Sequence, residues 1–172
     1  MIHLRELFSE QIGKVLDEVS GTKLSSYPMR WKAYFPVVGP EDESGDLFGA
    51  VGGYSEKHYG SFVSSLIMLR TACAQDMLNP PLNDRNCHAM VHFKYEDNNR
   101  TIYELINGQV RTPWFYCPFR HRQLIVSHSF LKKTQKAPTA EQNHAIALYK
   151  DYSRDMRAHP KPQVTFHADK KK

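Results

Sequence analysis

Residues 130–138 of this chain form the stretch FLKKTQKAP. An apolar run at residues 124–126 leads into it, and a segment with helical spacing follows it. The stretch therefore lies at the junction between a predicted strand and a predicted helix. It contains three cations within five positions: Lys132, Lys133 and Lys136. Such a compact group of ammonium groups suits a phosphate better than it suits a hydrophobic core.

The segment after this stretch predicts a helix over residues 139–156. Its apolar residues recur at helical spacing: Ala140, Ala145, Ile146, Leu148, Tyr149 and Tyr152. Thr139 followed by Gln142 resembles a capping box behind Pro138. At this spacing we expect Tyr149 and Tyr152 to be core residues rather than platforms for a nucleic-acid base.

Three strands are predicted before the stretch. They cover residues 91–95 continuing to 101–105, residues 114–117 and residues 123–130, with turn signals at residues 97–99 and at Asn107-Gly108. Within the last of these strands, His128 alternates with Leu124, Val126 and Phe130. Because side chains alternate between the faces of a strand, His128 is expected to be an interior histidine whose hydrogen bonds are satisfied.

The first half of the chain predicts two helices and one strand. Apolar residues at helical spacing favour a helix over residues 2–19, and aromatic and β-branched content favours a strand over residues 30–38. Residues 41–53 are acidic and rich in glycine and are expected to form a loop. A second helix begins near Ser55 and ends before Pro80, because proline cannot continue a helix.

This order of elements predicts an α+β domain with a small, mainly antiparallel sheet packed on helices. Residues 1–27 are expected to be an N-terminal helical extension, and residues 28–157 the main domain. Residues 158–172 carry basic residues and have little to bury, so they are expected to be a flexible tail.

The composition excludes several classes of protein. The chain has 172 residues, 41% of them hydrophobic, which is enough for one domain with a buried core. No apolar run approaches the roughly 18 residues of a membrane-spanning helix, and no export signal is found. Three scattered cysteines, Cys73, Cys87 and Cys117, form no disulfide framework. We therefore expect a cytoplasmic protein without membrane association or cofactor.

The charge is distributed unevenly along the chain. Residues 1–99 contain 9 Lys/Arg and 13 Asp/Glu, a balance of −4, whereas residues 100–172 contain 14 Lys/Arg and 5 Asp/Glu, a balance of +9. The basic half is the one that contains the lysine stretch. Nucleic acid is the natural partner for such a field, and a solvated basic surface is the alternative.

Several segments occur in the same order as in one known family. They are Ile102–Leu105 (IYEL), Trp114–Tyr116, residues 124–138, and the helical segment with Glu141, Ala145 and residues 149–152. Through them the chain resembles HigB-type toxins of the RelE/ParE superfamily, in the phage-related branch with the signature F-x-K-K-T-Q-K-x-P. The specific resemblance covers residues 102–152 and leaves out residues 1–27 and the tail.

The resemblance implies a RelE-like sheet packed on helices with a concave basic surface. It also implies the activity of many relatives, which is cleavage of messenger RNA (mRNA) on the ribosome, held in check by an antitoxin protein of the helix-turn-helix type. One position departs from the family, because Pro113 stands where relatives usually have an arginine before the aromatic strand. Arg111 lies two residues earlier and points to the same face of an extended chain, so it is the candidate substitute.

Metal-free RNA cleavage needs groups that stabilise the phosphate and groups that move protons. We assign Lys132, Lys133, Lys136 and Arg111 to the phosphate, with one crowded lysine or His121 as the base. Arg120 and Arg122 are assigned to RNA binding, and Gln135 to orienting a base or a sugar hydroxyl. Cys87, His88 and His92 match no standard four-ligand zinc site, so no metal is assigned.

Two further hypotheses compete with the nuclease. The first is a non-catalytic binding module of the same fold that grips RNA, gyrase or a partner protein, which Pro113 motivates. In the second, the predicted helix at residues 2–19 covers the basic groove as an electrostatic lid, through Glu6, Glu10, Asp17 and Glu18. Deletion of residues 1–27 would then raise toxicity.

Overall fold

A mixed β-sheet forms the centre of the protein. The structure is a computed structural model and describes residues 1–168. Among these residues the sheet has eight strands, with the order β3-β4-β5-β6-β2-β1-β8 and with β7 paired to β5. The strands are β1 (Ile2–Glu6), β2 (Lys32–Val37), β3 (Cys87–Tyr95), β4 (Asn98–Asn107), β5 (Val110–Tyr116), β6 (Gln123–Val126), β7 (Phe130–Leu131) and β8 (Val164–His167). Most neighbours are antiparallel, but β2–β6 and β1–β8 are parallel.

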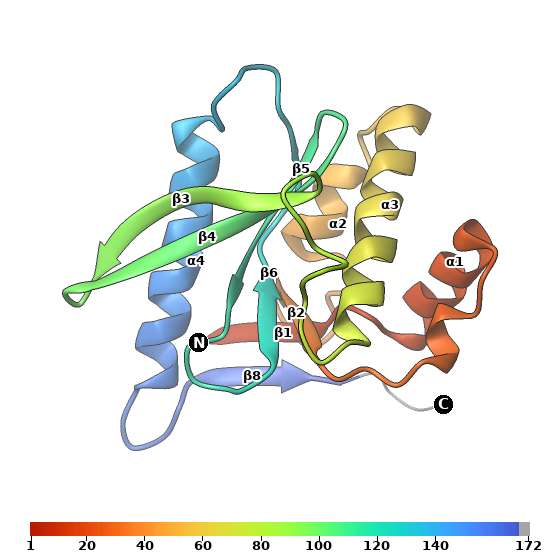
Figure 1. Ribbon diagram of the computed structural model, residues 1–172. Helices are drawn as coiled ribbons and strands as arrows, with labels where there is room; N and C mark the ends of the chain where they lie inside the picture. The colour runs from red at the N-terminus through yellow and green to blue at the C-terminus, as the bar shows by residue number, and fades with distance from the viewer. Residues whose placement is uncertain (169–172) are drawn as a thin grey trace.

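Helices cover both faces of this sheet and give the molecule three layers (Figure 1). The helices α1 (Glu10–Ser20), α2 (Gly45–Val51) and α3 (Glu56–Cys73) lie on one face, together with the short 3-10 helix η1 (Leu24–Ser26). The helix α4 (Thr139–Met156) lies on the other face and is the one helix there among the described residues. The long β3–β4 hairpin extends beside α4 at the edge of the sheet (Figure 1).

Two hydrophobic cores result from this arrangement. On the α3 side the buried residues include Leu7, Phe35, Phe62, Leu66, Leu69, Trp114 and Leu124. On the α4 side they include Leu4, Tyr34, Ile102, Phe115, Ile125, Tyr149 and Tyr152. Neighbouring residues of one strand enter different cores, as Trp114 and Phe115 do, because successive side chains point to opposite faces. The strands β2, β5 and β6 therefore carry consecutive apolar residues, as is typical of strands buried on both faces.

The expectation of a mainly antiparallel sheet packed on helices is confirmed. The expectation of a small sheet is wrong, because β1 and β8 add two strands beyond β2. The helix expected near Ser55 is α3, whose first turn is capped by Ser55 Oγ accepting from His58 N. The helix expected at residues 139–156 is α4, although Pro138 rather than Thr139 occupies its N-cap position. Residues 41–53 are not all loop, since they contain α2.

The N-terminal segment differs most from its sequence pattern. Residues 2–6 form β1, and only residues 10–20 form a helix, so the continuous helix expected at residues 2–19 is wrong. β1 pairs with β2 on one side and with β8 on the other, and its Leu4 is fully buried. α1 packs on the α3 side of the sheet, away from the end that carries residues 132–136 (Figure 1). The segment is therefore a part of the sheet and not a lid over the lysines.

The expected flexible tail also contains a strand. Residues Val164–His167 form β8, which is parallel to β1, and Gln163 N donates to Asp155 O at the end of α4. Phe166 of β8 packs edge-on against Tyr34, with ring centroids 5.0 Å apart. The last part of the tail, residues 169–172, lies outside the described residues. Among residues 1–168, no helix is long and apolar enough to cross a membrane.

Candidate functional site

A buried carboxylate, that of Glu104, lies at the centre of the candidate site. The strand register aligns His88 of β3 with Glu104 of β4, and Glu104 with Pro113 of β5, so these side chains share the α4 face. Glu104 is only 1% exposed. Its Oε1 lies 3.6 Å from His88 Nδ1 and 3.8 Å from Arg111 Nε. Three strands thus bring one acid and two basic groups together.

Burial gives Glu104 unusual acid–base behaviour. Desolvation raises the pKa of its carboxyl above the ordinary value of 4.5, while Arg111, His88 and Lys132 pull the pKa back down. Among the described residues, Glu104 Oε2 is buried without a hydrogen-bond partner. A carboxylate held in this way favours positively charged neighbours and protons, so it can stabilise an imidazolium beside it.

Arg111 and Lys132 reach this carboxylate because two chain segments are joined at the end of the sheet. β7 pairs with the start of β5, with Phe130 opposite Arg111, and Lys132 N donates to Gln109 O at 2.8 Å. The turn between β4 and β5 is tight and needs Gly108, whose φ is 55°. Arg111 Nη1 donates to Gly108 O at 2.6 Å and to Val110 O at 3.1 Å, which fixes the guanidinium at this turn.

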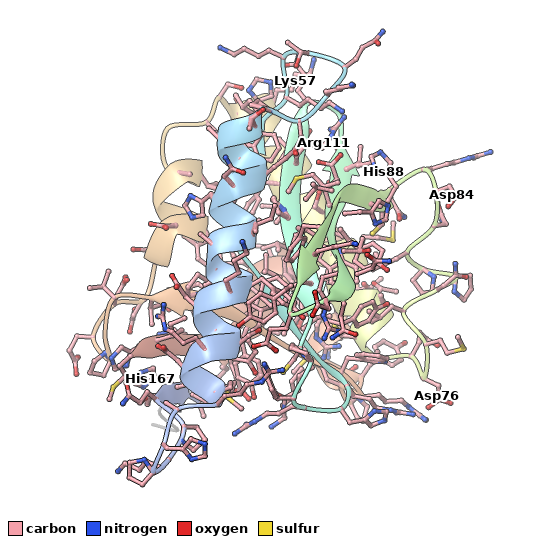
Figure 2. All side chains as sticks on the ribbon, turned by 90° about the vertical axis from the view of Figure 1, so that its left-hand side faces the viewer. Lys57, Asp76, Asp84, His88, Arg111 and His167 are labelled. Carbon is pink, nitrogen blue, oxygen red and sulfur yellow. The ribbon has the colours of Figure 1, made fainter. Side chains whose placement is uncertain are left out.

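His88 is the part of the cluster that solvent can reach. Its side chain is 46% exposed, whereas that of Arg111 is 13% exposed. Figure 2 shows both side chains at the same end of the sheet. His88 Nδ1 lies 3.2 Å from Ala89 O, and Glu104 Oε1 is the second acceptor near it. Because both neighbours accept hydrogen bonds, Nδ1 carries the proton in the neutral ring, and Nε2 keeps a lone pair that can take up a proton.

The remaining residues of the lysine stretch border this cluster. Lys133, Gln135 and Lys136 are exposed in the loop between β7 and α4, where Thr134 Oγ1 donates to Lys136 O at 2.7 Å. The first turn of α4 begins directly afterwards, at Thr139. The free N–H groups of a helix N-terminus and its dipole favour an anion. This end of the fold is therefore suited to a phosphate group.

A second polar cluster, centred on His128, lies between the end of the sheet and the first turns of α4, next to the loop that carries the lysines. The buried His128 bonds through Nδ1 to Ser127 Oγ at 2.9 Å and through Nε2 to Glu141 Oε2 of α4 at 2.6 Å. Its ring stacks on that of His144, with centroids 4.2 Å apart. Burial and His144 lower the pKa of His128, and Glu141 opposes this effect. The prediction of a satisfied interior histidine is confirmed, and this histidine joins the end of the sheet to α4.

The structure divides the predicted site residues between two ends of the sheet. Five of them lie at the end with Glu104: Arg111, Lys132, Lys133, Gln135 and Lys136. Three others lie in the turn between β5 and β6, at the far end of β5: Arg120, His121 and Arg122. β5 has seven residues, so the two groups are about 20 Å apart. His121 is therefore not beside the lysines and cannot exchange a proton at the same phosphate.

Sequence reasoning missed the two groups at the centre of the cluster. His88 was considered only as a zinc ligand, and Glu104 only as one letter of the segment IYEL. The signal for Glu104 was its place between Ile102 and Ile106 on one face of an apolar strand, where a charge needs a partner. Among residues 1–168, no group of three or more His, Cys, Asp or Glu side chains could hold a metal ion. No protein-family model matches the chain, and no curated protein is similar enough to match it.

Proposed function

We propose that this protein is an endoribonuclease that cleaves RNA through attack by the 2′-hydroxyl on the adjacent phosphorus. The observation that carries the proposal is the cluster around Glu104, whose Oε1 lies 3.6 Å from His88 Nδ1 and 3.8 Å from Arg111 Nε, with Lys132 close enough to lower the pKa of its carboxyl. It combines a proton acceptor open to solvent, a buried carboxylate behind it and cations in front of it. These are the groups that the reaction requires.

The reaction can be written with His88 as the base. Nε2 of the neutral ring takes the proton of the 2′-hydroxyl, and the oxygen forms a bond to phosphorus. The bond from phosphorus to the 5′-oxygen breaks, and Lys132 supplies the proton of the leaving oxygen, which gives a 2′,3′-cyclic phosphate and a 5′-hydroxyl. Glu104 stabilises the imidazolium that forms, and it acts as a positioning residue because it is buried behind His88.

The cations stabilise the charge that develops on the phosphate oxygens. Arg111 is held at the β4–β5 turn by its two hydrogen bonds to backbone carbonyl groups, so its guanidinium needs little rearrangement during the reaction. It lies in the same strand as Pro113 and reaches Glu104, which supports it as the substitute for the arginine that relatives have there. Lys133 and Lys136 are exposed and contribute a field that salt can screen.

We further propose a biological role as the toxin of a type II toxin–antitoxin system. The basis is the resemblance of residues 102–152 to HigB-type toxins and the basic charge of the second half of the chain. The substrate would then be mRNA on the translating ribosome, and an antitoxin protein would hold the activity in check.

The experiment is a cell-free translation reaction with a defined message, in which cuts are mapped by primer extension. We expect new 5′ ends with the protein present, and a loss of roughly 10²-fold or more in His88→Gln and in the double variant Lys132→Ala with Lys133→Ala. Lys14→Ala is the matched control, because Lys14 is an exposed cation on α1. A parallel reaction without ribosomes tests whether cleavage depends on translation.

The proposal fails if the message stays intact at protein doses that clearly engage ribosomes. It also fails if His88→Gln cuts as fast as the unaltered protein. Binding of RNA without cutting would instead favour a non-catalytic module of this fold.

A further inference from the structure

A group of aromatic rings lies on the face of the sheet opposite to Glu104, and its outermost ring, at the end of β5, is exposed. Tyr116, the last residue of β5, is 44% exposed. Its ring centroid lies 5.9 Å from that of Trp31 and 5.0 Å from that of Trp114. Tyr103 completes the group, 5.7 Å from Tyr116 and stacked on Trp114 at 5.0 Å. Contacts with three neighbouring rings hold the exposed ring of Tyr116 in a fixed position, where an unpaired base can reach it.

Arginines flank these rings. Arg30 forms an ion pair with Asp76 and Arg122 lies 3.6 Å from the same carboxylate, so one exposed acid is shared by two guanidinium groups. Trp31 Nε1 donates to Asp76 O at 3.1 Å, which ties the indole ring to the same loop. Figure 2 shows Asp76 at the end of the molecule opposite Arg111 and His88. Arg122 has a φ of 54°, an unfavourable conformation for a residue with a side chain.

We propose that Tyr116 and Trp31, with Arg30 and Arg122, form a second site that binds single-stranded RNA. Bases would stack on the rings, and phosphates would bind the arginines in place of the shared Asp76. The site takes only its ligand, RNA, from the function proposed above, and it would hold nucleotides other than the one that is cut. Stacking on aromatic rings combined with backbone contacts to cations is the usual mode of binding to unpaired strands.

Charge favours RNA over a protein partner at this end. The exposed His121 lies in the same turn as Arg122, whereas the Arg120 guanidinium packs over the ring of Phe166 on the α4 face of the sheet, 3.9 Å from the ring centroid. Beside the rings, Arg30 and Arg122 share the one carboxylate of Asp76. Cations therefore outnumber acids around the rings. This assignment also gives Arg122 a role in RNA binding, although it lies about 20 Å from the lysine stretch along β5.

The test measures the affinity for a fluorescently labelled, single-stranded 2′-O-methyl RNA of about a dozen nucleotides, by fluorescence anisotropy. This RNA cannot be cut by 2′-hydroxyl attack, so binding is measured apart from cleavage. We expect Tyr116→Leu to weaken binding roughly tenfold, because it keeps apolar volume and removes the ring, and Tyr116→Phe to bind like the unaltered protein. Tyr59→Leu is the matched control, since Tyr59 is an exposed tyrosine (47%) in the first turn of α3, away from the Trp31 and Tyr116 rings.

Removal of the flanking cations gives an independent readout. In a plot of log affinity against log salt concentration, the slope for Arg30→Gln should be shallower by roughly 0.7, as expected for one lost phosphate contact on a single strand.

Equal affinity of Tyr116→Leu and the unaltered protein would overturn the proposal. An absence of binding to this RNA would also overturn it, and would point to a protein partner instead. RNA binding that depends on Tyr116 in a protein without cleavage activity would sustain the site while refuting the nuclease. If cleavage needs His88 but RNA binding does not depend on Tyr116, the nuclease is supported and the second site is refuted.

Discussion

Glu104 is a residue whose function conflicts with the stability of the fold. Its folded-state pKa lies above the ordinary 4.5, so the folded protein binds this proton more tightly than the unfolded chain does. The stability that this difference contributes is fully present below pH 4.5 and is lost as pH rises through the folded-state pKa. We therefore predict that Glu104→Gln unfolds at a higher temperature than the unaltered protein at pH 7, and that this advantage shrinks towards pH 4.

Thermal unfolding of both proteins at a series of pH values measures this difference. The same variant should lose cleavage activity, since the glutamine amide cannot stabilise an imidazolium at His88. Two unfolding curves with a constant separation at every pH would contradict the prediction.

For His128 we predict that two substitutions shift the pKa of its imidazole in opposite directions. Burial and the stacked ring of His144 lower its pKa, whereas Glu141 raises it. His144→Gln should therefore raise the pKa of His128, and Glu141→Gln should lower it further. A nuclear magnetic resonance titration of the His128 ring protons measures both shifts, and shifts of the same sign would refute the assignment. Because the folded-state pKa lies below 6.5, this histidine removes stability from the fold as pH falls below that value.

The residues of the cluster show what one sequence could and could not reveal. The lysine stretch and Arg111 were predicted as site residues, because charge and position in a strand are local properties. Glu104 and His88 meet only through the register of three strands, and that register depends on pairings across the sheet. A single sequence does not encode the register in any short segment, so their proximity could not be predicted.

At the level of elements, α2 depends on one glycine. Gly45, its first residue, has a φ of 50°, and a Cβ atom there would lie 2.1 Å from Pro36 O. Gly45→Ala should therefore reduce the free energy of unfolding by at least about 2 kcal/mol, through the strained backbone and the displaced strand β2. Gly49→Ala in the same helix is the control, because nothing lies within 4 Å of the added atom and alanine favours a helix. Urea unfolding of both variants measures the difference, and equal effects would refute it.

The two long helices were predictable and the edge elements were not. α3 and α4 carry apolar residues over 18 positions each, a length that distinguishes a helix from a strand. β1 has only five residues. Its Leu4 is followed by Phe8 and Ile12 at a spacing of four residues, and this pattern is the one expected for a helix. β8 follows two prolines and is recognisable only by its pairing with β1. Short strands depend on their neighbours for their conformation, and their sequences say little about it.

The position of β1 changes the expected effect of an N-terminal deletion. β1 pairs with strands on both sides, and Leu4 and Leu7 are fully buried. Deletion of residues 1–27 should therefore abolish folding instead of raising toxicity. Circular dichroism and solubility of the truncated chain test this prediction, and a soluble, folded and more toxic truncation would restore the lid hypothesis.

At the scale of the whole molecule, the helices on the two faces of the sheet come from parts of the chain that differ in charge. Residues 1–99, with a balance of −4, supply the helices on the α3 side, whereas residues 100–168, with 11 Lys/Arg and 4 Asp/Glu and thus a balance of +7, supply α4, the lysine stretch and the β5–β6 turn. The cations at the two ends of β5 are about 20 Å apart, and Glu104 and Tyr116 face opposite sides of the sheet. A short oligonucleotide can reach only one end, and a longer one can reach both.

Two connected contacts bind more tightly than either alone, because the second becomes intramolecular. We predict that the affinity for single-stranded 2′-O-methyl RNA rises steeply once the strand is long enough to span both ends, and that Tyr116→Leu removes this rise while binding of the shortest strands persists. A length series measured by fluorescence anisotropy at one salt concentration tests this. A gradual increase that is identical in both proteins would show that the two ends do not hold the same strand, since charge alone adds affinity evenly with length.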